Sequence, residues 1–406
     1  MTLFWRTREG LSRSRLAASR LLRLLMNEIY FSLIHSASCI SKLLSLQSNM
    51  KSFALSFGLI PSDYLSLMTH STPQERWIES SYTPSSVVKP LIFVSACENS
   101  ERSGGYKFNG GINEYNCLVK FLRQHGYEAY IVTYDGNYEH WLLEHQPHIS
   151  LEDFRQKTKL YSNIRCVTSW ALARDFIREC NSLYFWDMEL CYTDHEHFSA
   201  LARLYKTKIK KTASISRTIQ AWHMANFERP CTIIPNLLDE DYFKPNEAMR
   251  KYNRIGYMDE GEHTEKHITS FGNAAMSAGL ELEFCKIEGD AKEFLRRMQS
   301  CNIFISMNLG KDPLWGEGCP RTIIEALSTG AVVLAYDIIG NREIILHSFN
   351  GIIVPRYCMD IMTKVLIDLY KSPSEIERLR ENGLNLIRSC HTQEARWPLI
   401  KEFLDL

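Results

Sequence analysis

Residues 316–330 read Gly-Glu-Gly-Cys-Pro-Arg-Thr-Ile-Ile-Glu-Ala-Leu-Ser-Thr-Gly, and they decide the fold class of this 406-residue chain. Pro320 suits the first position of a helix, where its missing N–H would have no partner anyway. Gly330 suits the left-handed conformation that often ends a helix. The apolar run at 331–336 predicts a strand buried in a parallel sheet. The stretch therefore predicts a glycine-rich loop, a short helix and a strand of an α/β protein.

The start of this helix has the chemistry of an anion site. Unpaired N–H groups and the helix dipole favour a phosphate there, and the amides near Gly318 and Cys319 are placed to meet a diphosphate. Glu317 in the loop and Glu325 in the helix are acceptors for hydroxyl groups. A ligand that carries both groups is a nucleotide sugar. On these residues alone, an ordinary capped helix with solvated carboxylates is the simpler interpretation.

A wider pattern surrounds the two glutamates. Seven residues separate Glu317 from Glu325 in a Glu-X7-Glu motif, and Gly-Asn-Arg-Glu at 340–343 and Asn-Gly at 350–351 follow. This pattern resembles the donor-site signature of retaining glycosyltransferases of GT-B architecture, family-4 type (glycosyl transferases group 1). The match is strong over 317–354 and weaker from about residue 90 onward. It implies two Rossmann-like, doubly wound domains that face each other across a cleft, with an N-terminal helical extension.

The resemblance also implies a reaction and a set of site residues. The enzyme would move a sugar from a nucleotide-diphosphate donor to a hydroxyl of a glycan or lipid-linked acceptor, in the synthesis of glycans or cell-surface polysaccharide. Glu317, the catalytic candidate, would contact sugar hydroxyls near the anomeric carbon, and Glu325 would hold the ribose. No cofactor or obligatory metal is implied, because helix-end amides and cations would stabilise the leaving diphosphate. The donor-binding set is completed by Gly318, Cys319, Pro320 and Arg321.

A strand–loop–helix–strand unit opens the first predicted domain. Residues 91–95 are a continuous apolar run, 103–111 form a polar loop with four glycines, a helix extends to about residue 125, and 130–134 form the next strand. This loop and helix resemble the first ones of the same family, which implies that Gly110 and Gly111 approach the donor and Asn113 the acceptor side. We expect further strands at 163–167, 182–186 and 212–216, and a helix at 170–179.

Two polar features in this domain admit a structural or a functional interpretation. Asp187 follows a predicted strand, where it would either touch an acceptor or cap the next turn, and capping is the simpler role. His195-Glu-His197 lacks the i, i+4 spacing that places two metal ligands on one helix face. We therefore interpret it as a polar turn.

The second predicted domain repeats the alternation. We expect strands at 252–258, 282–286 and 302–306, and helices at 267–278 and 291–299. Two packed helices should divide near residues 372–373, and the resemblance implies that a last helix at 392–406 returns to the first domain. The predicted divisions are an extension and linker at 1–85, the acceptor-side domain at 86–245, the nucleotide-sugar domain at 246–390 and the returning helix at 391–406.

One stretch departs from the family pattern. Members usually carry an Arg and a Lys after the first strand of the second domain, where they grip the donor diphosphate, but here 259–265 is rich in acids. Lys266 is the nearest donor-binding cation, and Lys311 or Arg321 would substitute from elsewhere. Acids facing a diphosphate without a cation would lose favourable pairing. The rival hypothesis is therefore a non-catalytic GT-B subunit that binds a nucleotide sugar; a third, less favoured by the motif, is an epimerase.

The N-terminal extension is basic and rich in leucine. Such a segment can lie as an amphipathic helix on an anionic membrane surface; a solvated or packed helix and an organelle transit peptide are the alternatives. Its apolar part is a poor spanning helix, and no signal-peptide cleavage pattern follows. Within the first fifty residues, two acids oppose the following cations: Arg6, Arg8, Arg13, Arg15, Arg20, Arg23 and Lys42.

Composition narrows the class and compartment. A formal net charge of zero argues against a dedicated nucleic-acid binder. Twelve cysteines are present without a Cys-X-X-Cys pair, which argues against a zinc site. We interpret them as buried free thiols in a reducing cytosol. The sequence thus predicts a cytoplasmic protein, peripheral to the membrane where the N-terminal helix attaches.

Overall fold

The computed structural model describes residues 89–95, 110–139, 141–169, 180, 182–188, 195–259, 262–308 and 319–406. The chain divides into two compact units, residues 1–84 and 85–406, and every described residue lies in the second. The predicted N-terminal helix, the helix at 170–179 and most of the loop at 103–111 lie outside the described residues. Among the helices that the structure describes, none is long and apolar enough to span a membrane.

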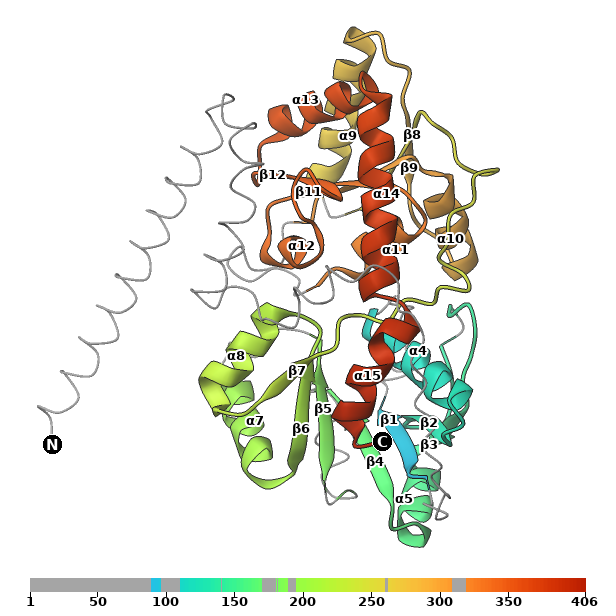
Figure 1. Cartoon of the computed structure of the whole chain (residues 1–406), viewed down its shortest axis with the longest axis vertical. Helices are drawn as coiled ribbons and strands as arrows, with labels where there is room; N and C mark the ends of the chain where they lie inside the picture. Colours follow the sequence, from blue (N-terminus) through green and yellow to red (C-terminus); the bar gives the residue numbers. More distant parts are fainter. Residues whose placement is uncertain are drawn as a thin grey trace, which may run out of the picture. The chain divides into compact units, whose positions relative to one another are not determined.

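The first half of the described chain forms a seven-stranded parallel sheet with the order β3-β2-β1-β4-β5-β6-β7 (Figure 1). Its strands are β1 (Leu91–Ser95), β2 (Ala129–Thr133), β3 (His148–Ser150), β4 (Ile164–Thr168), β5 (Leu183–Asp187), β6 (Ile209–Ser214) and β7 (Cys231–Ile233). The helices described around it are α4 (Gly110–Gln124), α5 (Leu151–Leu160), α7 (His195–Thr207) and α8 (Arg217–Phe227).

The second half forms a five-stranded parallel sheet with the order β12-β11-β10-β8-β9. Its strands are β8 (Arg254–Tyr257), β9 (Glu283–Lys286), β10 (Ile303–Ser306), β11 (Val332–Tyr336) and β12 (Gly351–Val354). The helices are α9 (Glu262–Ser277), α10 (Ala291–Ser300), α11 (Arg321–Ser328), α12 (Ile339–Ile344), α13 (Met359–Tyr370), α14 (Pro373–Cys390) and α15 (Gln393–Leu404). Two parallel, helix-covered sheets confirm the predicted fold class.

The central strands β1, β10 and β11 are mainly apolar because helices bury both faces of each sheet. All five residues of β1 and of β11 are buried. One hydrophobic cluster contains residues of both sheets, among them Ile92 of β1 and Val333 of β11. The packing of the first sheet is therefore continuous with that of the second.

Two helix starts differ from the sequence-based predictions. The interpretation of His195-Glu-His197 as a polar turn is wrong, because α7 begins at His195. Leu201, Leu204 and Tyr205 further along that helix are buried, and this apolar face outweighs the polar start. Pro320 is the N-cap of α11 rather than its first residue. Gly330 ends the helix with φ of +81°, as predicted.

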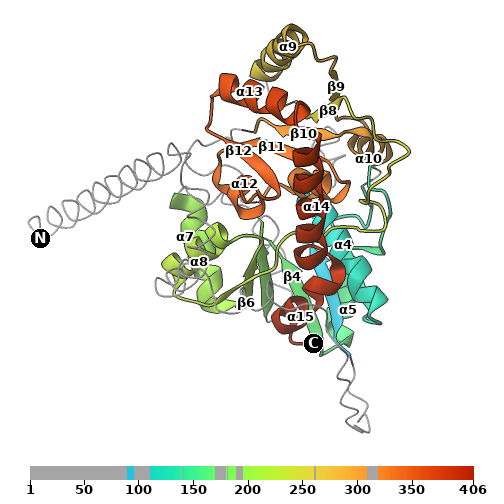
Figure 2. The same cartoon turned by 45° about the horizontal axis from the view of Figure 1, so that its top comes forward.

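Helix α15 returns to the first sheet after α14 (Figures 1 and 2). The Nε atom of Arg165 on β4 donates to the Leu404 carbonyl at 3.0 Å. The Tyr184 hydroxyl on β5 donates to Asp405 at 2.8 Å. The chain therefore crosses between the sheets twice, once between β7 and β8 and once between α14 and α15.

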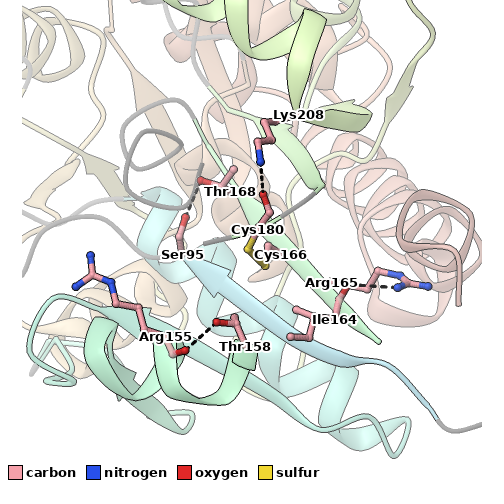
Figure 3. Close-up of a disulfide and its surroundings, with 9 residues drawn as sticks. All are labelled: Ser95, Arg155, Thr158, Ile164, Arg165, Cys166, Thr168, Cys180 and Lys208. Carbon is pink, nitrogen blue, oxygen red and sulfur yellow. Dashed lines mark hydrogen bonds between the residues drawn. A yellow bond between two sulfur atoms is a disulfide. The ribbon is translucent and has the colours of Figure 1, made fainter. Parts of the chain in front are cut away.

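The interpretation of the cysteines as free thiols is wrong for one pair. Cys166 on β4 and Cys180, shortly before β5, form a disulfide (Figure 3). Both are buried in one hydrophobic cluster, and Lys208 donates to the Cys180 carbonyl at 3.1 Å. The pairing brings together residues that are 14 positions apart, which scattered cysteines in a sequence do not reveal. Free thiols among the described residues are Cys117, Cys231, Cys285, Cys301, Cys319, Cys358 and Cys390.

Candidate active site

The N-termini of α4 and α11 meet, although the helices belong to different sheets. A methyl group in place of the Gly110 hydrogen would lie 3.9 Å from Cδ of Arg321, the first residue of α11. Helix α4 comes after β1 in the chain and α11 after β10, and in each sheet that strand adjoins the point where the strand order reverses. Ligands bind at such points in open α/β sheets.

A cluster of buried charges lies where the two helices meet. Arg321 donates from Nη1 to Oε2 of Glu114 at 2.5 Å and from Nε to Oε1 of Glu325 at 2.8 Å. Its Nη2 faces the sulfur of Cys117 at 3.7 Å and, with the Asn113 amide turned to satisfy both groups, the Asn113 oxygen at 3.2 Å. The side chains of Glu114, Glu325 and Arg321 are 1%, 6% and 10% exposed. Each guanidinium nitrogen therefore faces a protein group.

Burial controls the protonation of this cluster. Burial raises the pKa of Glu114 to about 7, although Arg321 and a backbone hydrogen bond from Leu237 oppose the shift. Burial also raises the pKa of Glu325, again against the effect of Arg321. One guanidinium thus stands between two carboxylates whose ionised forms both depend on it.

The crossing between β7 and β8 touches the same cluster. The Leu237 amide donates to Oε1 of Glu114, and the side chain of Asn236 donates to the Cys319 carbonyl at 2.9 Å. The Leu238 amide donates to the carbonyl of His391, at the second crossing, at 3.3 Å. The start of α11 is therefore fixed to α4 and to the first crossing, which itself contacts the second.

A second contact joins elements of the two sheets. Glu343 on α12 accepts hydrogen bonds from the amides of Arg217 and Thr218 at 3.3 and 3.1 Å, and from the Thr218 hydroxyl at 2.9 Å. These groups form the start of α8, where the helix dipole favours a carboxylate. Glu343 belongs to the Gly-Asn-Arg-Glu segment of the sequence pattern, so this part of the pattern has a structural role.

The structure places part of the predicted site. Gly110, Gly111 and Asn113 lie in the first turn of α4, while Cys319 and Pro320 are buried just before Arg321 and Glu325. Lys266 is exposed on α9. The structure therefore brings Gly110, Asn113, Arg321 and Glu325 together. Glu317, Gly318 and Lys311 lie outside the described residues. The roles assigned to all these residues stay predictions.

Two charged residues were not predicted from the sequence: Glu114, which contacts Arg321, and Lys286, which contacts the acidic stretch. The sequence signal for Glu114 was a carboxylate in a helix that is apolar on most sides. Lys286, at the end of β9, forms ion pairs with Asp259 at 3.0 Å and Glu288 at 3.2 Å. The hydrogen bond with Asp259 raises the pKa of Lys286. Lys286 is the register partner of Tyr257, so its approach to Asp259 depends on sheet order, which the sequence does not display.

Asp187 belongs to a buried chain of hydrogen bonds that the sequence did not predict, and both roles considered for it from the sequence stay predictions. Its carboxylate lies 2.6 Å from Nε2 of His223, and the Tyr205 hydroxyl lies 2.6 Å from Nδ1 of the same ring. The side chains of Asp187 and His223 are each 1% exposed. This chain of hydrogen bonds joins β5, α7 and α8 inside the first half of the molecule. Across the described ranges, no three His, Cys, Asp or Glu side chains are grouped as metal ligands.

Comparisons with known proteins identify the architecture. Residues 280–386 match the family model "Glycosyl transferases group 1". A glycosyltransferase from Rickettsia africae shares the fold with a TM-score of 0.56 and 12% identity, over 78% of this chain and 99% of that one. HepE of Anabaena in complex with UDP-glucose has a TM-score of 0.56 and 13% identity, with the same coverage. Sucrose-phosphate synthase of Thermosynechococcus elongatus has a TM-score of 0.55 and 11% identity, over 77% of this chain and 98% of that one. No curated protein matches the chain by sequence.

Proposed function

We propose that the chain is a retaining glycosyltransferase of family-4 type, because residues 280–386 match the glycosyl transferases group 1 model and the chain shares the GT-B fold of known glycosyltransferases. It would transfer a sugar from a nucleotide-diphosphate donor to a hydroxyl of a glycan or lipid-linked acceptor. The proposed pathway is the synthesis of glycans or cell-surface polysaccharide. The proposed reaction uses no obligatory metal.

The observation that carries this proposal is the meeting of two helix N-termini beside a buried carboxylate. The amides at the start of α4 and α11 favour a diphosphate, and Glu325 in the first two turns of α11 is an acceptor for ribose hydroxyls. The group 1 match includes all of α11. HepE was crystallised with UDP-glucose and with UDP, which supports a nucleotide sugar as the ligand of this fold.

The acidic stretch after β8 opposes a diphosphate less than the sequence alone implied. Asp259 is paired with Lys286 at 3.0 Å, so a cation already stands beside one of the acids. In the proposed reaction the leaving diphosphate is stabilised by helix amides and cations. Glu317 would contact the sugar near its anomeric carbon, and Gly110, Gly111 and Lys266 would contact the donor, with Asn113 on the acceptor side. The pairing of Asp259 with Lys286 therefore favours an enzyme over a non-catalytic binding subunit.

A donor assay tests the proposal. Purified full-length protein is incubated with UDP-, GDP-, ADP- and TDP-sugars and with glycan or polyprenyl-phosphate acceptors, and nucleoside diphosphate release is measured with and without a chelator. We expect release from one donor class, unaffected by the chelator. Proton NMR of the product should show the anomeric configuration of the donor. An inverted product contradicts the retaining mechanism, and donor binding without turnover favours the non-catalytic subunit.

The basic N-terminal segment supports a second part of the proposal, a cytoplasmic protein that attaches to an anionic membrane surface. Each Arg near such a surface contributes about 1 kcal/mol. Changing six arginines to glutamine in the full-length protein should therefore abolish sedimentation with phosphatidylserine vesicles, while neutral phosphatidylcholine vesicles bind neither protein. Equal sedimentation of both proteins with the anionic vesicles would contradict attachment through this segment. The changed residues are Arg6, Arg8, Arg13, Arg15, Arg20 and Arg23.

A further inference from the structure

We propose that Glu114 is a positioning residue of the donor site, which holds Arg321 against Glu325 from the opposite sheet. The inference rests on the proposed function and adds to it a residue from the acceptor-side half of the molecule. Glu114 itself touches neither donor nor acceptor in this account. Glu114 holds Arg321 in place, and Arg321 in turn holds the Glu325 carboxylate.

The geometry of the guanidinium supports this role. Nη1 of Arg321 donates to Glu114 and Nε donates to Glu325, so the two carboxylates use different nitrogens of one planar group. A planar fork with fixed donors transmits the orientation of one partner to the other. Removal of either carboxylate from the fork releases the arginine to turn on its long side chain.

Glu114 is itself held on two sides. Its Oε2 accepts from Arg321, and its Oε1 accepts from the backbone amide of Leu237 in the crossing segment. Its side chain is 1% exposed, so both oxygens depend on these partners for the hydrogen bonds that water would supply. The position of Glu114 is therefore set by the crossing, and the position of Arg321 by Glu114.

The arrangement leaves a defined place for a ribose. Arg321 engages Oε1 of Glu325, so Oε2 is the oxygen that a ribose hydroxyl would use. Burial raises the pKa of Glu325, and Arg321 opposes this effect. If Arg321 turned away, Glu325 would therefore be protonated more readily. A protonated Glu325 has less capacity to accept hydrogen bonds from the two ribose hydroxyls. Donor affinity should therefore depend on Glu114 although it lies on the other sheet.

The test is a double-mutant cycle on donor affinity. Glu114→Gln, Glu325→Gln and the double variant are compared by calorimetry, with whichever of UDP-, GDP-, ADP- and TDP-glucose the wild type binds best. We expect Glu114→Gln to weaken binding at least about tenfold, since hydrogen bonds to charged groups are involved. The double variant should bind no more weakly than Glu325→Gln alone, because both changes act on one carboxylate.

A matched control separates positioning from stability. Asp239 is another buried carboxylate that pairs with a cation, Lys120, at 3.2 Å. It lies in the crossing segment between β7 and β8 and does not contact Arg321, so Asp239→Asn removes a buried ion pair away from the fork. This variant should lower the melting temperature as Glu114→Gln does, yet leave donor affinity within about twofold of the wild type. If Glu114→Gln fails to fold, Arg321→Lys, which keeps the charge but not the fork, should show the same loss.

The outcomes are distinct. Wild-type affinity in Glu114→Gln, or losses that add in the double variant, contradict the positioning role while leaving the proposed function intact. Absence of binding by the folded wild type to every donor contradicts the proposed function itself, and the inference with it.

Discussion

Changing Arg321 to methionine is expected to lower the free energy of unfolding by about 3–5 kcal/mol and to abolish donor binding. The change leaves Glu114 and Glu325 buried without their cation, and removing one partner of a buried ion pair has this magnitude of cost. The affected carboxylate Glu325 is also the proposed ribose acceptor. Urea unfolding followed by circular dichroism measures the first effect, and calorimetry with the donor measures the second.

Glu114→Gln, made in both the wild type and Arg321→Met, tests whether the broken ion pair causes the loss of stability. Glu114→Gln in the wild type removes a partner of Arg321 and should destabilise the protein. In the Arg321→Met variant it removes an unpaired buried carboxylate and should stabilise it. The effect of one substitution thus reverses sign between the two backgrounds. Destabilisation by Glu114→Gln in both backgrounds would show that the ion pair does not account for the loss of stability.

Changing Lys120 to methionine is expected to lower the free energy of unfolding by a similar amount, about 3–5 kcal/mol. Lys120 on α4 pairs with Asp239 at 3.2 Å, Asp241 at 2.9 Å and Glu144 at 3.0 Å, and the side chains of Lys120 and Asp239 are each 9% exposed. Burial lowers the pKa of Lys120, but the carboxylates outweigh burial and hold the pKa above its usual value. Without the lysine, Asp239 would be buried uncompensated. Equilibrium unfolding in urea measures the loss.

An exposed lysine is the matched control for this prediction. Lys210 pairs with Asp405 at 2.6 Å, but its side chain is 46% exposed. Lys210→Met should therefore cost less than about 1 kcal/mol, because solvent screens exposed pairs. Equal losses for Lys120→Met and Lys210→Met would contradict the view that the buried pair fixes the crossing segment to α4.

Several central strands were predictable from the sequence because they are buried on both faces. Residues 91–95, 302–306 and 331–336 are apolar runs, and each contains a strand of the structure within one residue of the predicted ends. Two of the edge strands, β3 and β12, were missed, whereas the edge strand β9 lies within the strand predicted at 282–286. β3 and β12 have only three and four residues, and each is partly exposed, so neither shows a long apolar run. The resemblance implied two doubly wound domains, but the order of the strands within each sheet was not predicted.

The candidate site was predictable only where its residues are neighbours in the sequence. Arg321 and Glu325 are four residues apart on one helix, so their proximity follows from helix geometry. Glu114 lies 207 positions from Arg321, and nothing near either residue marks the pair. The same limit applies to Lys286 and Asp259, which meet because β8 and β9 are adjacent. A sequence motif therefore predicts contacts within its own helix, whereas it does not predict contacts with charged residues that are distant in the sequence.

The contacts between the two sheets have a common feature. Glu114 and Glu343 are carboxylates that reach from one sheet to elements of the other, Glu114 to Arg321 and Glu343 to the start of α8. In each contact a negative group meets a positive one, a guanidinium or a helix N-terminus. Helices α11 and α12 are thus both tied to the half of the molecule that contains the first sheet. We infer that the proposed donor site is completed by residues from both halves.

The role of Glu325 in nucleotide-sugar binding is tested by the affinity of the wild type and of Glu325→Gln for UDP-, GDP-, ADP- and TDP-glucose, measured by titration calorimetry. Glutamine keeps the size of the side chain and removes the charge that would accept hydrogen bonds from the ribose. We expect the wild type to bind one nucleotide class and folded Glu325→Gln to bind it at least about tenfold more weakly. Equal affinity of the two folded proteins for every donor would contradict this role.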